Sequence, residues 1–263
     1  MTIAEHIVRV CATGGDATAI DLDGETLNWA AWGSAITALD ALLAAEGIGS
    51  DAVIGLLGRN RLEQLSAFVA TLGTGRSLSL VNAVRPVGLI VEEVADLGLC
   101  CLLGSAADLP EPVVAVLRTL SGKGARPYRP RSPGMLIEIQ TSGTTGKPKR
   151  IPVAERTFAA SLQDGVRNAT GEVIRKELKV QRSPTLMFGP LVHTSGTINT
   201  LMSVFEVRQR DRGPCRHGGP AAGIAGRFRG EVRRTCACHL RCDRVHGDRH
   251  QLDLGGLQEL WKR

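Results

Sequence analysis

The sequence predicts an α/β protein in which mostly parallel sheets are flanked by helices. Short runs such as residues 52–57 and 99–103 are apolar throughout, as strands are when both faces of a parallel sheet are covered. Between these runs lie segments whose apolar residues recur every three or four positions, a spacing typical of helices. Strands and helices that alternate in this way over one chain indicate an α/β fold.

The predicted elements follow one another in a regular order. An Asp23-Gly24 pair separates two short strand-like segments and predicts a β-hairpin. The other predicted strands are 52–57, 77–81, 99–103 and 135–140, and the predicted helices are 30–46, 61–72, 86–97 and 112–120. Gly47 follows the first of these helices and Pro86 begins the third, and both positions favour those residues.

Composition separates a nearly neutral body from a basic tail. Residues 207–263 hold 13 Lys and Arg but only 6 Asp and Glu, whereas the net charge of the whole chain is +6. The same residues hold four of the seven cysteines and few large apolar side chains. We therefore expect residues 1–206 to form the folded domain and residues 207–263 to be an Arg/Cys/His-rich, disordered tail.

The location predicted from the sequence is the cytoplasm. No run of about 18 apolar residues occurs that would span a membrane. Glu5 and His6 lie where a secretion signal would be apolar. In this compartment we expect the cysteines to be thiols rather than disulfides.

A polar segment rich in glycine and threonine follows the predicted strand 135–140. It reads TSGTTGKPKR over residues 141–150. Its glycines allow successive backbone N–H groups to point into one concavity, and its hydroxyls and cations add further donors. Such a segment can hold a polyphosphate, although it differs from the common P-loop motif because Pro148 follows Lys147.

This segment resembles the phosphate-binding motif of the adenylate-forming superfamily, which includes acyl-CoA synthetases, luciferases and peptide-synthetase adenylation domains. Segments that begin near Thr26 and Val53, and the segment LMFGPLVHTSG at 186–196, resemble the family in the same order. We therefore identify residues 1–206 as the N-terminal part of an AMP-binding domain. The family motif has glycine where this chain has Arg150, and we expect a side chain there to crowd the loop.

The resemblance implies ATP-dependent activation of a carboxylic acid, of the acyl-CoA synthetase type. A carboxylate attacks the α-phosphate of ATP, with Mg²⁺ balancing charge, and a thiol such as coenzyme A then displaces AMP from the acyl-adenylate. His193 matches the family position beside the acid and the nucleotide and is the implied catalytic residue. The implied nucleotide-binding residues are Thr141, Ser142, Gly143, Thr144, Thr145, Gly146 and Lys149. Neither the acid nor the oligomeric state is indicated, and no residue is assigned to a metal.

The family motifs expected beyond residue 206 do not occur in this sequence. They include an aromatic-Gly-x-Thr-Glu segment and a catalytic lysine, both of which stabilise charge in the transition state. We therefore expect a truncated, inactive fragment, and whether the chain is an enzyme stays open. The composition changes abruptly near Glu206, which a shift of reading frame would explain. The alternative is a short active ligase completed by a partner chain.

The tail offers two further hypotheses. A cluster with zinc-binding side chains comprises Cys236, Cys238, His239, Cys242, His246 and His250, although it lacks the usual C-x2-C spacing. The arginines could attract nucleic acid, but only Phe228 and Trp261 are available to stack on bases, so no nucleic-acid partner is expected. Residues 251–261 allow one short helix.

Overall fold

The computed structural model describes residues 1–99, 101–104, 109–110, 112–113, 128–140, 149–170, 189–205 and 251–253. Its helices are α1 (Ile3–Gly14), α2 (Trp29–Ala45), α3 (Leu62–Gly73), α4 (Val87–Leu97), α6 (Glu155–Thr170) and α7 (Thr194–Phe205). Its strands are β1 (Thr18–Leu22), β2 (Glu25–Asn28), β3 (Val53–Gly58), β4 (Ser77–Asn82), β5 (Leu102–Gly104), β6 (Met135–Gln140), β7 (Arg150–Ala154) and β8 (Gln251–Asp253). Together they form the α/β fold that the sequence predicts.

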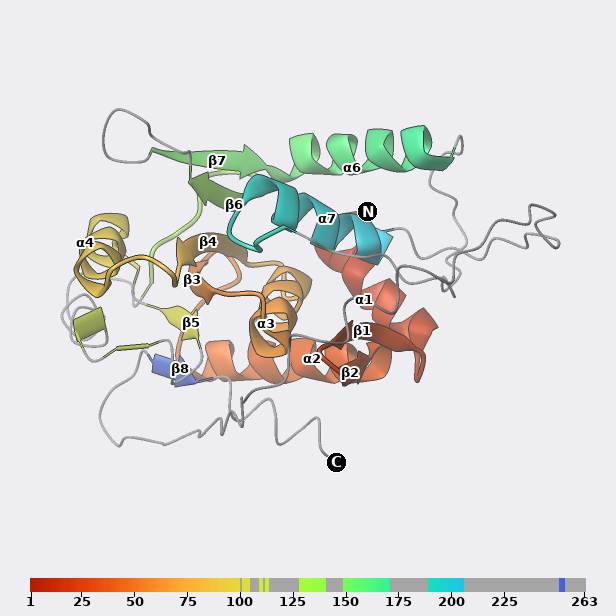
Figure 1. The fold of residues 1–263 in the computed structure, drawn as a ribbon, viewed down its shortest axis with the longest axis horizontal. Coiled ribbons are helices and arrows are strands. Elements are labelled where there is room, and N and C mark those ends of the chain that lie inside the picture. The colour runs from red at the N-terminus through yellow and green to blue at the C-terminus, as the bar shows by residue number, and fades with distance from the viewer. Residues whose placement is uncertain are drawn as a thin grey trace, which may run out of the picture.

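A six-stranded sheet in the order β7-β6-β4-β3-β5-β8 lies at the centre of the fold (Figure 1). All neighbouring strands run parallel except β6 and β7, which are antiparallel. Because β3, β4 and β6 run in one direction, their last residues, Gly58, Asn82 and Gln140, lie along one edge of the sheet. We call this edge the carboxyl edge.

Helices cover both faces of the sheet, which explains why the central strand β3 is apolar throughout. On one face, Ile54 and Leu56 of β3 belong to a core shared with α1, α2, α3 and α7. On the other face, Val53 and Leu57 belong to a smaller core that includes residues of α4. Successive side chains of β3 therefore enter opposite cores, as they do in a sheet covered on both sides.

The helix α1 at the amino terminus was not predicted from the sequence. It begins with a capping box, in which the Glu5 N–H donates to the Thr2 hydroxyl at 3.1 Å and the Thr2 N–H donates to the Glu5 carboxylate at 2.8 Å. α1 contacts α2, α3 and α7. The Ile3 N–H also donates to the carboxylate of Glu155, the first residue of α6, at 2.6 Å. The first helix is therefore fixed by the last two described helices.

The predicted β-hairpin is confirmed. β1 and β2 pair in antiparallel fashion, and Asp23 and Gly24 connect them with φ angles of 55° and 85°. Positive φ at both central residues is the conformation that an Asp-Gly pair adopts in the tightest hairpin turns.

The structure differs from the predicted elements at β7, at β5 and at residues 251–253. Arg150–Ala154 forms the edge strand β7, where no strand was predicted. β5 is confined to Leu102–Gly104, and of the predicted helix 112–120 only residues 112–113, which are helical, are described. Residues 251–253 form a strand that pairs with β5 rather than the start of a helix, so that backbone groups of this segment pair with the sheet. The rest of the predicted tail lies outside the described residues.

The described helices include none that is long and apolar enough to cross a membrane. Cys11 and Cys101 are buried thiols rather than members of a disulfide, as expected for these two cysteines.

Candidate functional site

The glycine–threonine loop, residues 141–149, is anchored at the carboxyl edge. It leaves the sheet after Gln140, the last residue of β6, and returns at Arg150, the first residue of β7. Lys149 is described and exposed. The other residues assigned to phosphate lie outside the described residues, and their roles stay predictions: Thr141, Ser142, Gly143, Thr144, Thr145 and Gly146. In open parallel sheets, ligands bind beyond the carboxyl ends of the strands, which is where this loop begins.

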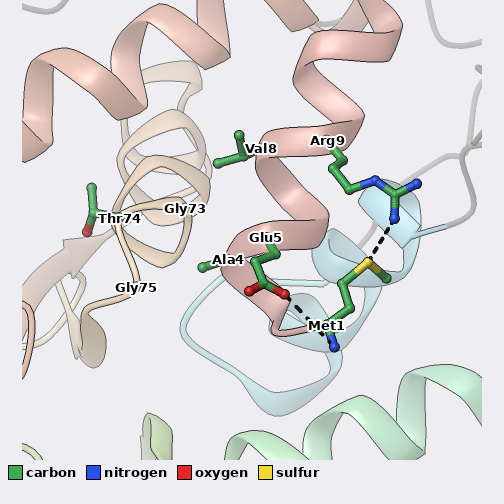
Figure 2. Close-up of a pocket in the computed structure, with 8 residues that line it drawn as sticks. All are labelled: Met1, Ala4, Glu5, Val8, Arg9, Gly73, Thr74 and Gly75. Atoms are coloured by element: carbon green, nitrogen blue, oxygen red, sulfur yellow. Dashed lines mark hydrogen bonds and ion pairs between the residues drawn. The ribbon is translucent and has the colours of Figure 1, made fainter.

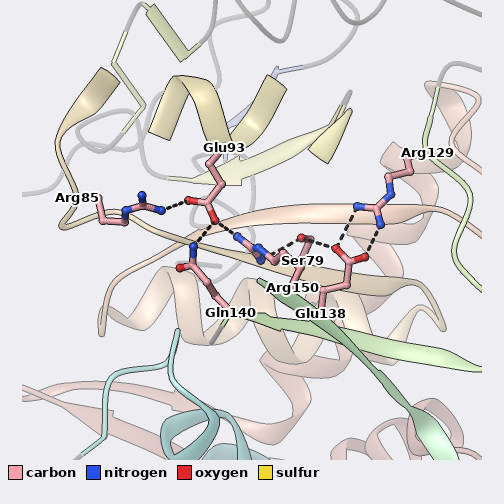
Figure 3. Close-up of polar contacts among 7 residues, drawn as sticks. All are labelled: Ser79, Arg85, Glu93, Arg129, Glu138, Gln140 and Arg150. Atoms are coloured by element: carbon pink, nitrogen blue, oxygen red, sulfur yellow. Dashed lines mark hydrogen bonds and ion pairs between the residues drawn. The ribbon is translucent and has the colours of Figure 1, made fainter. Parts of the chain in front are cut away.

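Both ends of the loop meet the carboxylate of Glu93 on α4 (Figure 3). Gln140 Nε2 donates to Glu93 Oε1 at 3.1 Å, and Arg150 Nη2 donates to the same oxygen. Arg85 Nη1 donates to the other oxygen, Oε2, at 2.7 Å. The side chains of Glu93 and Arg150 are only 9% and 12% exposed, so this ion pair is screened by water less than a surface pair would be.

The polar contacts continue from Arg150 into the sheet (Figure 3). Arg150 Nη1 donates to Ser79 Oγ at 3.3 Å, and the Ser79 hydroxyl donates to Glu138 Oε2 at 2.9 Å. Glu138 is 5% exposed, and both its oxygens accept hydrogen bonds from Arg129. A buried carboxylate needs such partners because its desolvation is otherwise unfavourable. The guanidinium of Arg150 thus lies over the sheet, and the predicted crowding of residues 141–148 lies outside the described residues.

His193 immediately precedes α7 and belongs to a segment that lies against the carboxyl end of β3. The His193 carbonyl accepts a hydrogen bond from the Thr197 N–H at 2.9 Å, and His193 is exposed. Asn60 fixes the preceding residues, since its Oδ1 accepts from the Leu191 N–H at 2.8 Å and its Nδ2 donates to the Gly189 carbonyl at 3.0 Å. These two bonds bring the predicted catalytic histidine to the carboxyl edge.

The close approach of this segment to β3 depends on a glycine. A Cβ atom placed on Gly58 would lie 2.6 Å from Cγ1 of Val192, which is too short for a carbon–carbon contact. The histidine segment and the glycine–threonine loop are therefore on the same edge, at strands separated only by β4. At about 4.8 Å between neighbouring strands, the ends of β3 and β6 are about 10 Å apart. An extended ligand can bridge that distance.

Asn60 and Glu93 were missed as site residues by the sequence analysis. The sequence did point to Asn60, because it lies within three residues of the end of a wholly apolar strand. The sequence did not point to Glu93, because Glu93 lies within a predicted helix and its partners Gln140 and Arg150 are 47 and 57 positions away.

The described ranges contain no group of three or more His, Cys, Asp or Glu side chains able to hold a metal ion. The cysteines and histidines of the predicted zinc cluster lie outside these ranges, and so do Phe228 and Trp261. The zinc and nucleic-acid hypotheses for the tail therefore stay predictions.

A shallow cavity of about 670 Å³ lies between α1 and the turn that follows α3 (Figure 2). It is lined by Met1, Ala4, Glu5, Val8, Arg9, Gly73, Thr74 and Gly75. Gly75 lies just before β4, so this cavity is at the amino end of that strand, opposite the carboxyl edge. It does not belong to the candidate site.

The fold is that of the adenylate-forming enzymes. o-Succinylbenzoate CoA synthetase of Bacillus subtilis, solved with an acyl-adenylate intermediate, superimposes with a TM-score of 0.58 at 20% identity, over 76% of this chain and 53% of that one. A luciferase-like enzyme of the mealworm Zophobas morio superimposes with a TM-score of 0.61 at 15% identity, over 78% of this chain and 52% of that one. The family model for AMP-binding enzymes matches residues 7–207, and the chain belongs to this family.

Curated relatives include domains of very large synthetases. The hybrid PKS-NRPS synthetase pvhA of Talaromyces variabilis is 24% identical over 234 residues, which are 81% of this chain and 6% of that protein. Tyrocidine synthase 3 of Brevibacillus parabrevis is 24% identical over 166 residues, which are 59% of this chain and 2% of that protein. The chain thus spans about half of the solved structures that it matches and a small part of these synthetases.

Proposed function

We propose that this chain binds the triphosphate of ATP at the carboxyl edge and supplies that part of an enzyme that activates carboxylic acids. The observation that carries the proposal is the place of the glycine–threonine loop. In a chain of the AMP-binding family, this loop is anchored where parallel strands end and where His193 is also held.

In the proposed reaction, a carboxylate oxygen of the acid attacks the α-phosphorus of ATP. The bond from that phosphorus to the bridging oxygen breaks, so that an acyl-adenylate and pyrophosphate form. A thiol, for which coenzyme A is the proposed carrier, then attacks the acyl carbon, loses its proton and displaces AMP. Solved members of the fold include o-succinylbenzoate CoA synthetase bound to ATP and a magnesium ion, which supports both ATP and Mg²⁺ as ligands here.

The roles of individual residues follow from the type of donor each one offers. The loop glycines offer backbone N–H groups, the loop threonines and serine offer hydroxyls, and Lys149 offers an ammonium group to the phosphates. The proposed role of His193 is to lie between the acid and the α-phosphate, where its ring N–H donates a hydrogen bond to the developing charge. Mg²⁺, when bound with the triphosphate, would neutralise part of the phosphate charge.

The test of nucleotide binding uses calorimetric titration of the full chain with MgATP. Lys149→Met removes one cation beside the phosphates at nearly constant length, and we expect it to weaken binding about tenfold. Arg9→Met is the matched control, because it removes one charge beside the cavity at the opposite end of β4. Equal affinities for the wild type and for Lys149→Met would contradict the proposed role of this lysine. A wild type that does not bind MgATP would contradict the function itself.

Turnover is tested separately, as pyrophosphate release with a panel of fatty, aryl and amino acids. We expect no release from the chain alone, because groups that the family places beyond its first half stabilise the charge of the reaction. Release that appears only with a second polypeptide would favour the alternative of a ligase completed by a partner chain. Robust release by the chain alone would contradict the proposed inactivity.

A further inference from the structure

We propose that Glu93 is a positioning residue whose carboxylate joins the two residues that flank the glycine–threonine loop, a set of contacts that we call the clamp, and thereby fixes the points at which the loop leaves and rejoins the sheet. The inference rests on the proposed function for the identity of the ligand. The clamp itself rests on described residues alone, Glu93 on α4, Gln140 at the end of β6 and Arg150 at the start of β7.

The two ends of the loop lie side by side on neighbouring strands. Gln140 and Arg150 are partners in the antiparallel register of β6 and β7 and form the last pair before the loop. β7 is the outermost strand of the sheet, and the last pair of an edge ladder opens more easily than pairs in its interior. A contact from a separate element is therefore what can keep this pair closed.

Glu93 makes that contact with a single oxygen atom. Its Oε1 accepts from Gln140 Nε2 at 3.1 Å and also from Arg150 Nη2, so one atom joins the residues on either side of the loop. Arg85 Nη1 occupies Oε2 at 2.7 Å and so fixes the orientation of the carboxylate. Fixing both ends of a loop removes conformations that ligand binding would otherwise have to exclude.

The charges of the clamp also suit an anionic ligand. Two guanidinium groups, those of Arg85 and Arg150, surround one carboxylate, whereas Glu138 nearby is balanced by Arg129. The clamp therefore leaves one net positive charge at the carboxyl edge, beside the residues where phosphates are proposed to bind.

The experiment compares hydrogen exchange of the loop amides in the full-length wild type and in two carboxylate-to-amide variants. Glu93→Gln keeps the shape of the clamp but removes its charge. Asp40→Asn is the matched control. Asp40 lies on α2 and forms an ion pair with Arg76 at 2.5 Å, and it contacts none of the residues of the clamp. Exchange of peptides covering 141–149 is measured without ligand and with MgATP, and the melting temperature of each variant is recorded.

In Glu93→Gln we expect the loop amides to exchange about tenfold faster, both without ligand and with MgATP, because the charged hydrogen bonds that hold the loop ends contribute at least that factor. Asp40→Asn should behave as the wild type in both respects. Equal loop exchange in the two variants would overturn the clamp. A wild type whose loop exchange does not change on addition of MgATP would instead contradict the proposed function. The loop exchange measured without ligand would still test the clamp.

Two further variants keep the test decisive if Glu93→Gln does not fold. Gln140→Leu and Arg150→Met each remove one arm and leave the Arg85–Glu93 pair in place. Faster exchange of 141–149 in either variant, at unchanged exchange of α2 and α3, supports the clamp. Unchanged loop exchange in both variants overturns it.

Discussion

Burial on one face of α1 changes the ionisation of two side chains. Burial lowers the pKa of His6 to about 4, the nearby charge of Arg9 acts in the same direction, and a hydrogen bond with the Val204 backbone opposes both. Burial also raises the pKa of the Cys11 thiol to about 11. Both groups are thus held neutral at pH 7 where α1 meets its neighbours, and Cys11 is an inert packing group rather than a reactive thiol.

The pKa of His6 predicts that the protein loses stability in mild acid. The folded-state pKa is below the usual value of about 6.5, so protons favour the unfolded chain, and stability present above pH 6.5 is lost as the pH falls toward 4. The full loss is about 3 kcal/mol, of which about 2 kcal/mol falls between pH 6.5 and 5. Urea unfolding at several pH values measures it.

The control for this prediction is His6→Leu, which removes the titrating group and keeps an apolar side chain of moderate size. Its free energy of unfolding should change less with pH between 6.5 and 5 than that of the wild type. The same pH dependence in both proteins would show that other groups cause the loss.

Individual contacts were the least predictable part of the site. The sequence indicates that polar residues after an apolar strand lie at a sheet edge, which applies to Asn60. It gives no indication that Asn60 binds Leu191, because the partners are 131 positions apart and meet only once the sheet is formed. The contacts of Glu93 with Gln140 and Arg150 could not be predicted for the same reason.

The elements were predicted best where both faces are buried. The apolar run of β3, the apolar residues within β4 and β6, and the glycine turn of the hairpin have local causes that the sequence displays. β7 was missed because Pro152 interrupts its pattern and its side chains are exposed or only partly buried, as in other edge strands. α1 was missed although Thr2 and Glu5 form a capping box, which is a recognisable start of a helix.

The capping box predicts the largest effect of a surface substitution in α1. Thr2→Ala removes the oxygen that accepts from the Glu5 N–H and should lower the free energy of unfolding by about 1 kcal/mol. Thr13→Ala is the matched control, since Thr13 is exposed near the end of the same helix and its hydroxyl donates only to the Arg9 carbonyl. Chemical denaturation of both variants measures the difference, and an equal loss in the two would contradict a capping role.

At the scale of the whole molecule, β7 is the outermost strand on one side of the sheet that the described residues form. Ile151 on this edge strand is 50% exposed, and an apolar edge strand offers unpaired backbone groups to another copy of the chain. We therefore expect the isolated chain to self-associate through this edge.

Ile151→Lys should reduce that self-association, because a charge on an edge strand opposes pairing between copies. Light scattering as a function of protein concentration measures the effect. Val8→Lys is the control, as Val8 is 46% exposed but lies on a helix and not on a sheet edge. Equal improvement by both substitutions would mean that added charge alone, rather than the blocked edge, raises solubility.

The bond from Ile3 to Glu155 and the contact of α1 with α7 have a consequence for synthesis on the ribosome. During translation, α1 emerges from the exit tunnel well before α6 and α7, with which it makes these contacts. Until α6 and α7 have been translated, the part of α1 that contacts them stays uncovered, although α2 and α3 can already pack against the rest of its apolar side. This is the period in which we expect a cotranslational chaperone to engage the chain.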